Sequence, residues 1–256
     1  MTEHERAFIG TGSVLVFLLV WEAVTLSRLV DPLFLSSPTL IARAGYELFA
    51  EGTIWKDLRV SGTEFVIGYL LAAGVAIPLG LAVGWYRRLY FCLSPFIDVL
   101  NAVPRVALLP IIIIWFGIGV WSKVVVVFLG AVIPMLLNTL SGVKTTEERF
   151  LKVARSFGAS ELKIFWSIVV PGTVPFIFTG LKYATGRALL GVVVGELYAA
   201  TAGIGYLIAV AGATFQTDKV FVGILIITTT GILVVELLNR LERRFEEWRP
   251  KVGSAT

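Results

Sequence analysis

The sequence has few of the residues that build metal, haem or disulfide sites. It contains one cysteine, Cys92, and one histidine, His4. An internal disulfide is therefore excluded, and a zinc or haem centre made from clustered His and Cys is excluded in practice. No Gly-Lys pair occurs in the chain, so it has no P-loop to hold nucleotide phosphates. It also lacks a His pair, a Gly-x-Ser-x-Gly motif and an acidic metal cluster, so we expect no enzyme activity and no cofactor or metal bound by this chain.

Charged side chains are also scarce. They make up 16% of the 256 residues, while 57% are hydrophobic, and the mean hydropathy is +0.85. Soluble domains are about 25% charged and about 45–50% apolar. The composition therefore indicates one membrane-embedded domain over residues 1–256, and the modest net charge of +4 gives no reason to expect a nucleic-acid partner.

Apolar stretches of the length needed to cross a bilayer recur along the chain. A spanning helix needs about 20 mostly apolar residues, and the stretches that qualify are 7–26, 60–85, 91–116, 122–140, 174–199 and 220–241. The first follows a weakly basic start and precedes no small-residue cleavage site, so we expect a retained span rather than a signal peptide. The predicted fold is an all-α polytopic membrane helix bundle with about six transmembrane helices.

The third stretch is the least regular because it contains Pro95, Pro104 and Pro110. Each proline removes a backbone donor and bends or breaks a helix. Asn101 and Arg105 lie on either side of the middle proline. Broken helix at membrane depth is tolerated where it is buried in protein or lines a wet cavity. The sequence leaves open whether this is one kinked span or two pieces.

Lysine and arginine in short loops predict the orientation. They are concentrated at 87–88, in the loop 143–171 and in the tail 242–256. Six spans place these segments on the same side as the N-terminus, which predicts cytoplasmic N- and C-termini. The segment 27–59 is then extracytoplasmic, and helical spacing over 39–49 predicts a short helix in it.

Small residues form a stripe on the second apolar stretch, with Gly68, Ala72, Ala76, Gly80 and Gly84 at every fourth position. The fifth stretch has a similar set, namely Gly180, Ala184, Gly191 and Gly195. Helices in lipid associate through such close backbone contacts. The stripe predicts tight packing within the chain or, alternatively, a sliding or subunit-contact face.

The loop 143–171 is amphipathic and too polar to span. Apolar residues recur at helical spacing up to Phe157, and Gly158 then interrupts the pattern. Ser160 can cap a second helix, with Leu162, Phe165 and Trp166 on its apolar side. We expect a helix, a glycine turn and a second helix that ends at Pro171. Such an element could contact a partner protein or lie on lipid.

This loop resembles a known motif. It reads Lys152-Val153-Ala154, three residues, Gly158, nine residues, Ile168, one residue and Val170-Pro171. The string is similar to the EAA loop of ABC import permeases, which reads Glu-Ala-Ala, three residues, Gly, nine residues, Ile, one residue and Leu-Pro. Lys152 replaces the usual Glu and Val153 the first Ala, whereas Ala154, Gly158, Ile168 and Pro171 match. The resemblance implies a coupling helix that seats in a groove of a separate ATPase.

Further strings resemble the nitrate/sulfonate/taurine/bicarbonate branch of these permeases. They are Ser37-Pro38, 103–110, 114–119, 195–197 and 203–207. The resemblance implies a type I importer permease in the inner membrane that works by alternating access. It also implies a second permease subunit, expected to be an identical copy, two ATPase subunits that hold ATP and Mg, and an extracytoplasmic solute-binding protein. The substrate would be a small anionic or polar solute, such as nitrate, a sulfonate, bicarbonate or a small organic precursor, which the sequence does not specify.

Two sets of candidate site residues follow. The ATPase-coupling loop comprises Phe150, Lys152, Val153, Ala154, Phe157, Gly158, Ala159, Ser160, Leu162, Phe165, Ile168 and Pro171. The candidate pathway lining comprises Asn101, Arg105, Asn138, Arg187 and Glu196.

The pathway candidates have structural alternatives. The arginines could line an anion pathway or form ion pairs with Asp98 or Glu22, and the asparagines could line the pathway or bond between helices. Arg187 and Glu196 lie nine residues apart on nearly opposite helix faces, so we do not expect them to pair. Lys182 is expected to extend toward the cytoplasm.

Two other functions would leave different signatures. A self-contained secondary transporter would have inverted repeats with paired broken helices, whereas one broken stretch without a clear mate occurs here. An integral membrane enzyme would need convergent catalytic groups, which the motifs do not supply.

Overall fold

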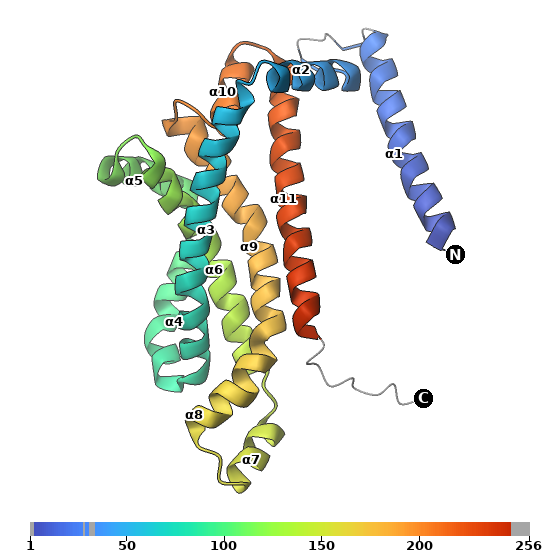
Figure 1. The fold of residues 1–256 in the computed structure, drawn as a ribbon. Coiled ribbons are helices and arrows are strands. Elements are labelled where there is room, and N and C mark those ends of the chain that lie inside the picture. Colours follow the sequence, from blue (N-terminus) through green and yellow to red (C-terminus); the bar gives the residue numbers. More distant parts are fainter. Residues whose placement is uncertain (1–2, 28, 31–33, 247–256) are drawn as a thin grey trace. The chain divides into compact units, whose positions relative to one another are not determined.

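The structure is a computed structural model that describes residues 3–27, 29–30 and 34–246 (Figure 1). Within these ranges it is helical and contains no strand, as the all-α prediction requires. The helices are α1 Glu3–Leu26, α2 Pro38–Ala50, α3 Ile54–Trp85, α4 Arg87–Ala102, η1 Arg105–Leu108, α5 Leu109–Phe116, α6 Val120–Lys144, α7 Glu148–Ser156, α8 Glu161–Ile164, η2 Phe165–Val169, α9 Val170–Ala199, α10 Ile204–Ala213 and α11 Thr217–Glu246.

The predicted number of spans is confirmed. In the described part of the chain, 5 helical segments are long and apolar enough to cross a membrane, and a bent pair raises the number to 6. The bent pair, Arg87–Ala102 with Arg105–Phe116, turns by 91°. The third apolar stretch is therefore two helical pieces rather than one kinked helix.

Among the three prolines of that stretch, only Pro104 coincides with the break. Val103 before it is extended, with φ −66° and ψ 125°, because the ring of a following proline disfavours helical backbone. Pro110 lies in the first turn of α5, where the missing N–H costs nothing. Pro95 is accommodated inside α4.

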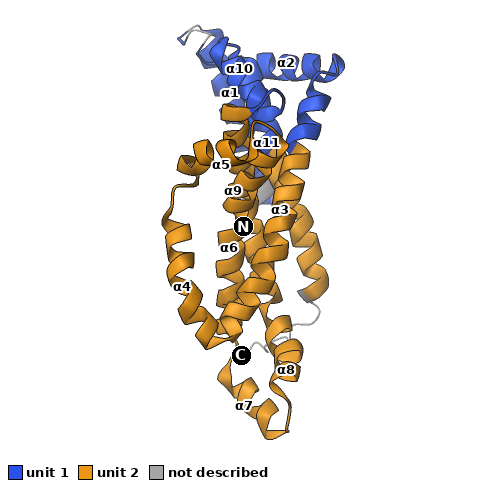
Figure 2. Cartoon of the chain, turned by 90° about the vertical axis from the view of Figure 1, so that its left-hand side faces the viewer, with its two compact units in different colours: residues 1–61, 200–228 blue, residues 62–199, 229–256 orange. Residues whose placement is uncertain are grey.

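The chain divides into two compact units (Figure 2). Unit 1 comprises Met1–Ser61 with Ala200–Thr228, and unit 2 comprises Gly62–Ala199 with Thr229–Thr256. The sixth predicted stretch forms part of α11, which continues to Glu246. The remainder of the predicted tail, 247–256, lies outside the described residues.

Unit 1 is organised around the short helix α2. Ile41, Ala44 and Leu48 are buried on one face of α2, where they pack with Ile204 and Val222. The predicted helix over 39–49 is thus present, and the Ser37-Pro38 string starts it. Ser37 Oγ accepts from Leu40 N at 3.3 Å, and Pro38 occupies the first helical turn.

Two further contacts fix the ends of helices in unit 1. Gly203 N donates to Asp57 Oδ1 and Ile204 N donates to Ser61 Oγ, both at 2.8 Å, so side chains of α3 cap the start of α10. Glu22 accepts from Thr39 N at 3.1 Å and from Thr39 Oγ1 at 2.6 Å. Glu22 therefore holds the start of α2.

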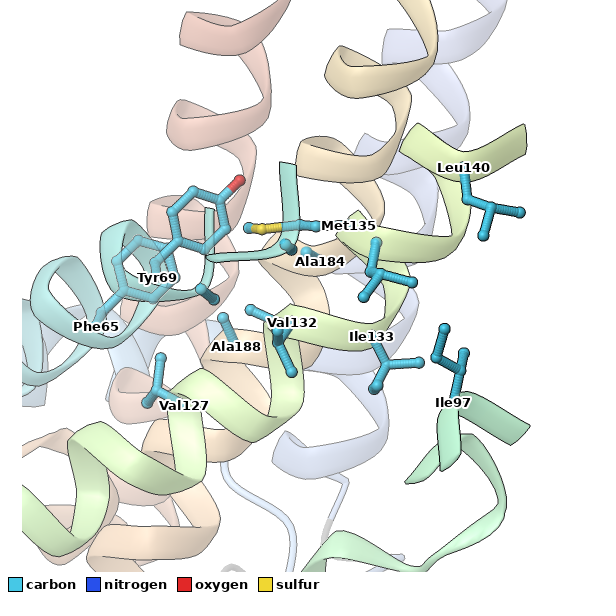
Figure 3. Packing of buried hydrophobic residues seen from close by; sticks show 14 of the residues in the cluster. Phe65, Tyr69, Ile97, Val127, Val132, Ile133, Met135, Leu140, Ala184 and Ala188 are labelled. Atoms are coloured by element: carbon cyan, nitrogen blue, oxygen red, sulfur yellow. The ribbon is translucent and has the colours of Figure 1, made fainter. Parts of the chain in front are cut away.

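Unit 2 is built around α6, which packs between α3 and α9 (Figure 3). The small-residue stripe of α3 faces α6 at backbone distance. A Cβ atom on Gly68 would lie 2.7 Å from Val127 Cβ, and one on Gly84 would lie 2.6 Å from Val143 Cβ. Ala72 is fully buried. The stripe thus serves close packing within the chain, the first of the two predicted alternatives.

The stripe on α9 also contacts α6. A Cβ atom on Gly191 would lie 3.2 Å from Val127 Cα, and one on Gly180 would lie 2.9 Å from Asn138 Cβ. Helix α6 contributes its own glycine, because a Cβ atom on Gly130 would lie 2.9 Å from the Arg187 carbonyl oxygen. Helices α6 and α9 therefore approach each other closely at glycines on both helices. We call these glycine positions on α3, α6 and α9, where a Cβ atom would collide with the facing helix, the glycine notches.

Three ionisable side chains are buried together at the α6 N-terminal end of unit 2. Glu64 of α3, Lys123 of α6 and Glu196 of α9 are 0%, 5% and 1% exposed. Lys123 Nζ lies 3.6 Å from Glu64 Oε1, and the Glu196 carboxyl adjoins that of Glu64. Gly195 makes room for the lysine stem, since a Cβ atom there would lie 3.0 Å from Lys123 Cγ. We call Glu64, Lys123 and Glu196 the charge triad.

The glycine notches make a prediction for stability. Gly80→Ala places a methyl group 2.8 Å from Thr139 Cβ and 3.0 Å from the Leu136 carbonyl oxygen. We therefore expect the free energy of unfolding to fall by about 1–3 kcal/mol, with a lower melting temperature in detergent. Gly74→Ala on the same helix is the matched control, because nothing lies within 4 Å of its added methyl group. Equal melting temperatures for the two variants would contradict the packing.

The charge triad makes a second prediction. Lys123→Met leaves two carboxyls buried together without their cation, and we expect a cost of about 3–5 kcal/mol in thermal unfolding. Glu64→Gln in the Lys123→Met background should recover part of that loss. The control is Arg240→Met, which breaks an exposed pair with Glu236 and should cost no more than about 1 kcal/mol. A Lys123→Met variant as stable as this control would rule out the ion pair as a structural element.

Candidate functional site

The loop predicted to couple to an ATPase forms a helical elbow, residues 148–164, in which α7 and α8 are joined by a glycine turn (Figure 1). Gly158 has φ +75°, a left-handed conformation that glycine adopts without strain. Its N–H donates to the Arg155 carbonyl at 2.9 Å, and Ala159 N donates to the Ala154 carbonyl at 3.0 Å. These bonds satisfy the last carbonyls of α7 and close the turn.

The second helix begins as expected and ends elsewhere. Ser160 is its N-cap, with Lys163 N donating to Ser160 Oγ at 3.4 Å. The prediction that Pro171 ends this helix is wrong. Helix α8 passes through the π-helical turn η2 into α9, and Glu161–Ala199 is one candidate span. Pro171 stands directly after that wider turn, where the regular i→i−4 hydrogen-bond ladder is already interrupted, so the absence of its N–H is tolerated.

An ion pair fixes the angle of the elbow. Arg155 Nε donates to Glu161 Oε1 at 2.8 Å and Arg155 Nη2 to Glu161 Oε2 at 3.2 Å, so the guanidinium bridges the turn with two bonds. The hydrogen bond to Glu161 raises the pKa of Arg155 above its ordinary value, so Arg155 stays protonated. Such paired bonds add geometric definition to the contact.

The elbow is attached to the bundle at few points and otherwise exposes apolar side chains. Ile164 is buried, and the Phe165 ring lies 5.5 Å from that of Trp85 at the end of α3. Helix α7 has no buried residue, and Phe157 at the turn is 86% exposed. Other exposed apolar residues on the elbow and the turn after it are Phe150, Val153, Leu162 and Trp166.

The remaining residues predicted for the coupling loop lie within or next to this elbow. Ala154, Ala159 and Ile168 are half-buried, whereas Ser160 and Pro171 are exposed. Lys152, which replaces the glutamate of the EAA pattern, pairs with Glu148 one turn earlier at 3.2 Å. Its positive charge is thus balanced within α7.

A hollow of about 1270 Å³ lies between the elbow and the adjoining ends of α3, α4 and α6. Leu162 and Trp166 line it on the elbow side. Across from them stand three cationic side chains, Arg87, Arg88 and Lys144. The basic segments that are distant in sequence therefore gather at one end of unit 2.

Three of the five residues predicted to line a pathway meet at the break between α4 and α5. Asn101, Arg105 and Arg187 line one cavity of about 450 Å³, with walls from α6 and α9. Arg105 and Arg187 thus bring two positive charges to the same cavity. Arg105 is partly buried, whereas Asn101 and Arg187 are exposed on the single chain.

The other two predicted lining residues are not part of this cavity. Asn138 Nδ2 donates to the Pro134 carbonyl of its own helix at 2.8 Å, so it neither lines the cavity nor bonds to another helix. Glu196 belongs to the charge triad. Lys182 pairs with Glu242 of α11.

Sequence reasoning missed several residues that shape these sites. Glu64 and Lys123 lie at the edges of apolar stretches, and their intramembrane charge was the signal that could have identified them. The Arg155–Glu161 bridge spans a non-helical turn, so no fixed helical spacing indicates it. The proposed partners of the arginines, Asp98 and Glu22, form no ion pair with them in the described ranges.

Comparison with known proteins adds to this geometry. The chain is 34% identical over 249 residues to the taurine transport system permease protein TauC of Escherichia coli (strain K12), which covers 95% of this chain and 90% of that protein. It is 31% identical over 251 residues to the formylaminopyrimidine transport permease protein ThiX of Halalkalibacterium halodurans, covering 98% and 100% of the two chains. A solved structure described as an amino acid ABC transporter with histidines aligns with a TM-score of 0.58 at 16% identity, over 77% of this chain and 98% of that one.

The structural alignment bears on the fold and confirms the expected architecture of an importer permease. Residues 74–247 match the family described as binding-protein-dependent transport system inner membrane component. That range contains both the elbow and the arginine-lined cavity. The chain therefore belongs to the family of binding-protein-dependent transport system inner membrane components.

Proposed function

We propose that this chain is the permease subunit of an ATP-driven importer, and that its elbow receives the movement of a separate ATPase. Two copies of the chain would form the pathway between them and open it alternately to each side. Two ATPase subunits would bind at the elbow end, and an extracytoplasmic protein would deliver the solute to the opposite end. ATP and Mg would be held by the ATPase subunits, since this chain has no P-loop.

The observation that carries the proposal is the exposure of apolar side chains on a hydrogen-bonded elbow. Its turn is closed by Gly158 and bridged by Arg155 and Glu161. Its apolar side chains, with Phe157 foremost, are left uncovered by the described part of the chain. A folded element with exposed aromatic residues is suited to a protein interface, where aromatic anchors contribute much of the affinity.

Movement at the elbow would reach the membrane helices directly. Helix α8 leads through η2 into α9 without a loop. Phe165, directly after the elbow, contacts Trp85 of α3. Lys144 at the end of α6 contacts α4, with its Nζ 3.4 Å from the Tyr90 ring centroid. The elbow is therefore connected to the helices that line the arginine cavity.

The charge distribution supports a cytoplasmic location for the elbow. Arg87, Arg88 and Lys144 surround the hollow beside it. At the opposite end of α6, Lys123 is buried and paired with Glu64. Positive charge in short loops favours the cytoplasmic side, so we propose cytoplasmic N- and C-termini in an inner membrane.

The proposed solute is small and anionic, with a sulfonate as the leading candidate. The name of the Escherichia coli relative specifies taurine, which carries a sulfonate group. The arginine-lined cavity has the charge that such a solute requires, because guanidinium groups bind oxyanions through paired hydrogen bonds. The relative that transports formylaminopyrimidine makes a small organic precursor the second candidate.

The orientation can be tested by cysteine labelling in intact cells. In a Cys92→Ser background, Ser156→Cys on α7 should react with a membrane-impermeant maleimide only after the cells are opened. Glu51→Cys at the end of α2 should react in intact spheroplasts. Labelling of Ser156→Cys from outside would place the elbow on the wrong side for an ATPase and would contradict the proposal.

Docking can be tested by co-purification with the ATPase. Phe157→Asp places a charge on the most exposed ring of the elbow, and we expect recovery of the ATPase in detergent to fall by about 10-fold or more, since a buried aromatic anchor contributes about 2 kcal/mol or more to an interface. Phe157→Leu is the matched control and should retain most of the binding.

A lipid-facing elbow would give a different result. Phe157→Asp would then leave ATPase recovery unchanged and would reduce partitioning of the elbow onto the membrane. Unchanged recovery, with the variant inserted at wild-type level, would therefore overturn the docking assignment.

A further inference from the structure

The cavity at the break between α4 and α5 is lined by two cationic side chains, Arg105 and Arg187. In the part of the chain that the structure describes, neither Arg105 nor Arg187 has a carboxylate within ion-pair distance. Asp98, one turn before Asn101, is exposed and its carboxylate pairs with neither. Glu196 is engaged in the charge triad. The compensation that buried or membrane-level charges usually find within a protein is missing here.

The backbone holds both arginines in place. Arg105 begins η1 directly after Pro104, where Ala107 N donates to the Pro104 carbonyl at 3.0 Å and closes a tight turn. The main chain at Arg187 packs closely against α6. Gly130 of α6 allows this approach, because a Cβ atom added at Gly130 would lie 2.9 Å from the Arg187 carbonyl oxygen. Two like charges thus line the same cavity, which costs electrostatic free energy unless an anion lies near them.

The rest of the lining limits the ligand. Asn101 adds an amide that can donate hydrogen bonds, and the cavity has no acidic side chain. Val126, Leu190 and Val194 supply apolar walls. A volume of about 450 Å³ lies within the range of small-molecule sites, about 300–1,000 Å³. These features fit a small organic acid whose oxyanion head meets the guanidinium groups and whose short carbon chain meets the apolar walls.

We propose that this cavity is a binding station for the oxyanion head group of the transported solute, with Arg105 and Arg187 as the ligating residues and Asn101 as an additional donor. The proposal rests on the permease function proposed above and specifies the solute class as small sulfonates or similar organic monoanions. Binding would replace the repulsion between the two guanidinium groups with attraction to a shared anion. The permease itself would then select for charge.

Binding can be measured on the full-length chain in nanodiscs of uncharged lipid, with ethanesulfonate as the probe and saturation-transfer NMR as the readout. Wild-type protein should bind ethanesulfonate and should not bind ethyl methyl sulfone, a neutral analogue of similar shape. Arg105→Gln and Arg187→Gln should each weaken binding about 10- to 100-fold, since each removes a hydrogen bond to a charged group. Arg240→Gln, which alters an exposed pair on α11, should bind as wild type does.

Several outcomes would overturn the site. They are no ethanesulfonate binding to wild type, equal binding of ethanesulfonate and the sulfone, or unchanged binding in both Gln variants. Preferential binding of formylaminopyrimidine would do the same. If the Gln variants fail to fold, the comparison of the two probes on wild-type protein still decides the question.

The test is independent of ATPase docking. A chain that co-purifies with an ATPase but binds no anion would keep the proposed function and lose this site. A chain that binds the anion but recovers no ATPase would keep the site and lose the coupling role of the elbow.

Discussion

Close backbone contact on both sides of α6 is the constraint on which the rest of unit 2 depends. Of the apolar window of α6, 61% of the residues are buried, compared with 6% for α1. In lipid no hydrophobic drive holds helices together, so dispersion contacts at short range must do so. Glycine and alanine on α3 and α9 make such contacts possible, because they carry no large side chain that would hold the helices apart. Each functional feature of unit 2 is attached to this three-helix layer.

The layer also explains how charge can be placed inside an apolar bundle. Lys123, Glu64 and Glu196 are contributed by α6, α3 and α9, so the charge triad ties together the same three helices that the glycines bring into contact. The arginine cavity uses the layer differently. There the chain breaks between α4 and η1, and Arg105 and Arg187 line a cavity beside α6 and α9. The same layer thus buries groups of opposite charge together at one place and leaves two like charges beside a cavity at another.

Much of the fold could be predicted from the sequence because the bilayer imposes strong length and polarity limits. The spans, the short helix at 38–50 and the glycine turn at Gly158 follow from hydropathy, spacing and capping alone. Pro171 shows where such reasoning fails. A proline breaks a regular helix interior, but here a π-helical turn precedes it, and that turn could not be foreseen from residue types. The candidate site was less predictable, because Asn101 and Asn138 are the same residue type, yet Asn101 lines the cavity and Asn138 bonds to a carbonyl of its own helix.

The packing also restricts how movement at the elbow can reach the cavity. Contacts at backbone distance resist sliding, because a shift of α6 by one turn would drive Val127, Thr139 or Val143 out of their glycine notches and against larger neighbours. Helices α3, α6 and α9 should therefore move as one body. The break at Val103 and Pro104 is different, since Val103 has an extended backbone and Pro104 has no N–H to donate, so the helical ladder is interrupted there. Relative movement within unit 2 is easiest at that break, and Arg105 stands directly beside it, so a change of angle there would alter the distance between the two guanidinium groups and with it the affinity for an anion.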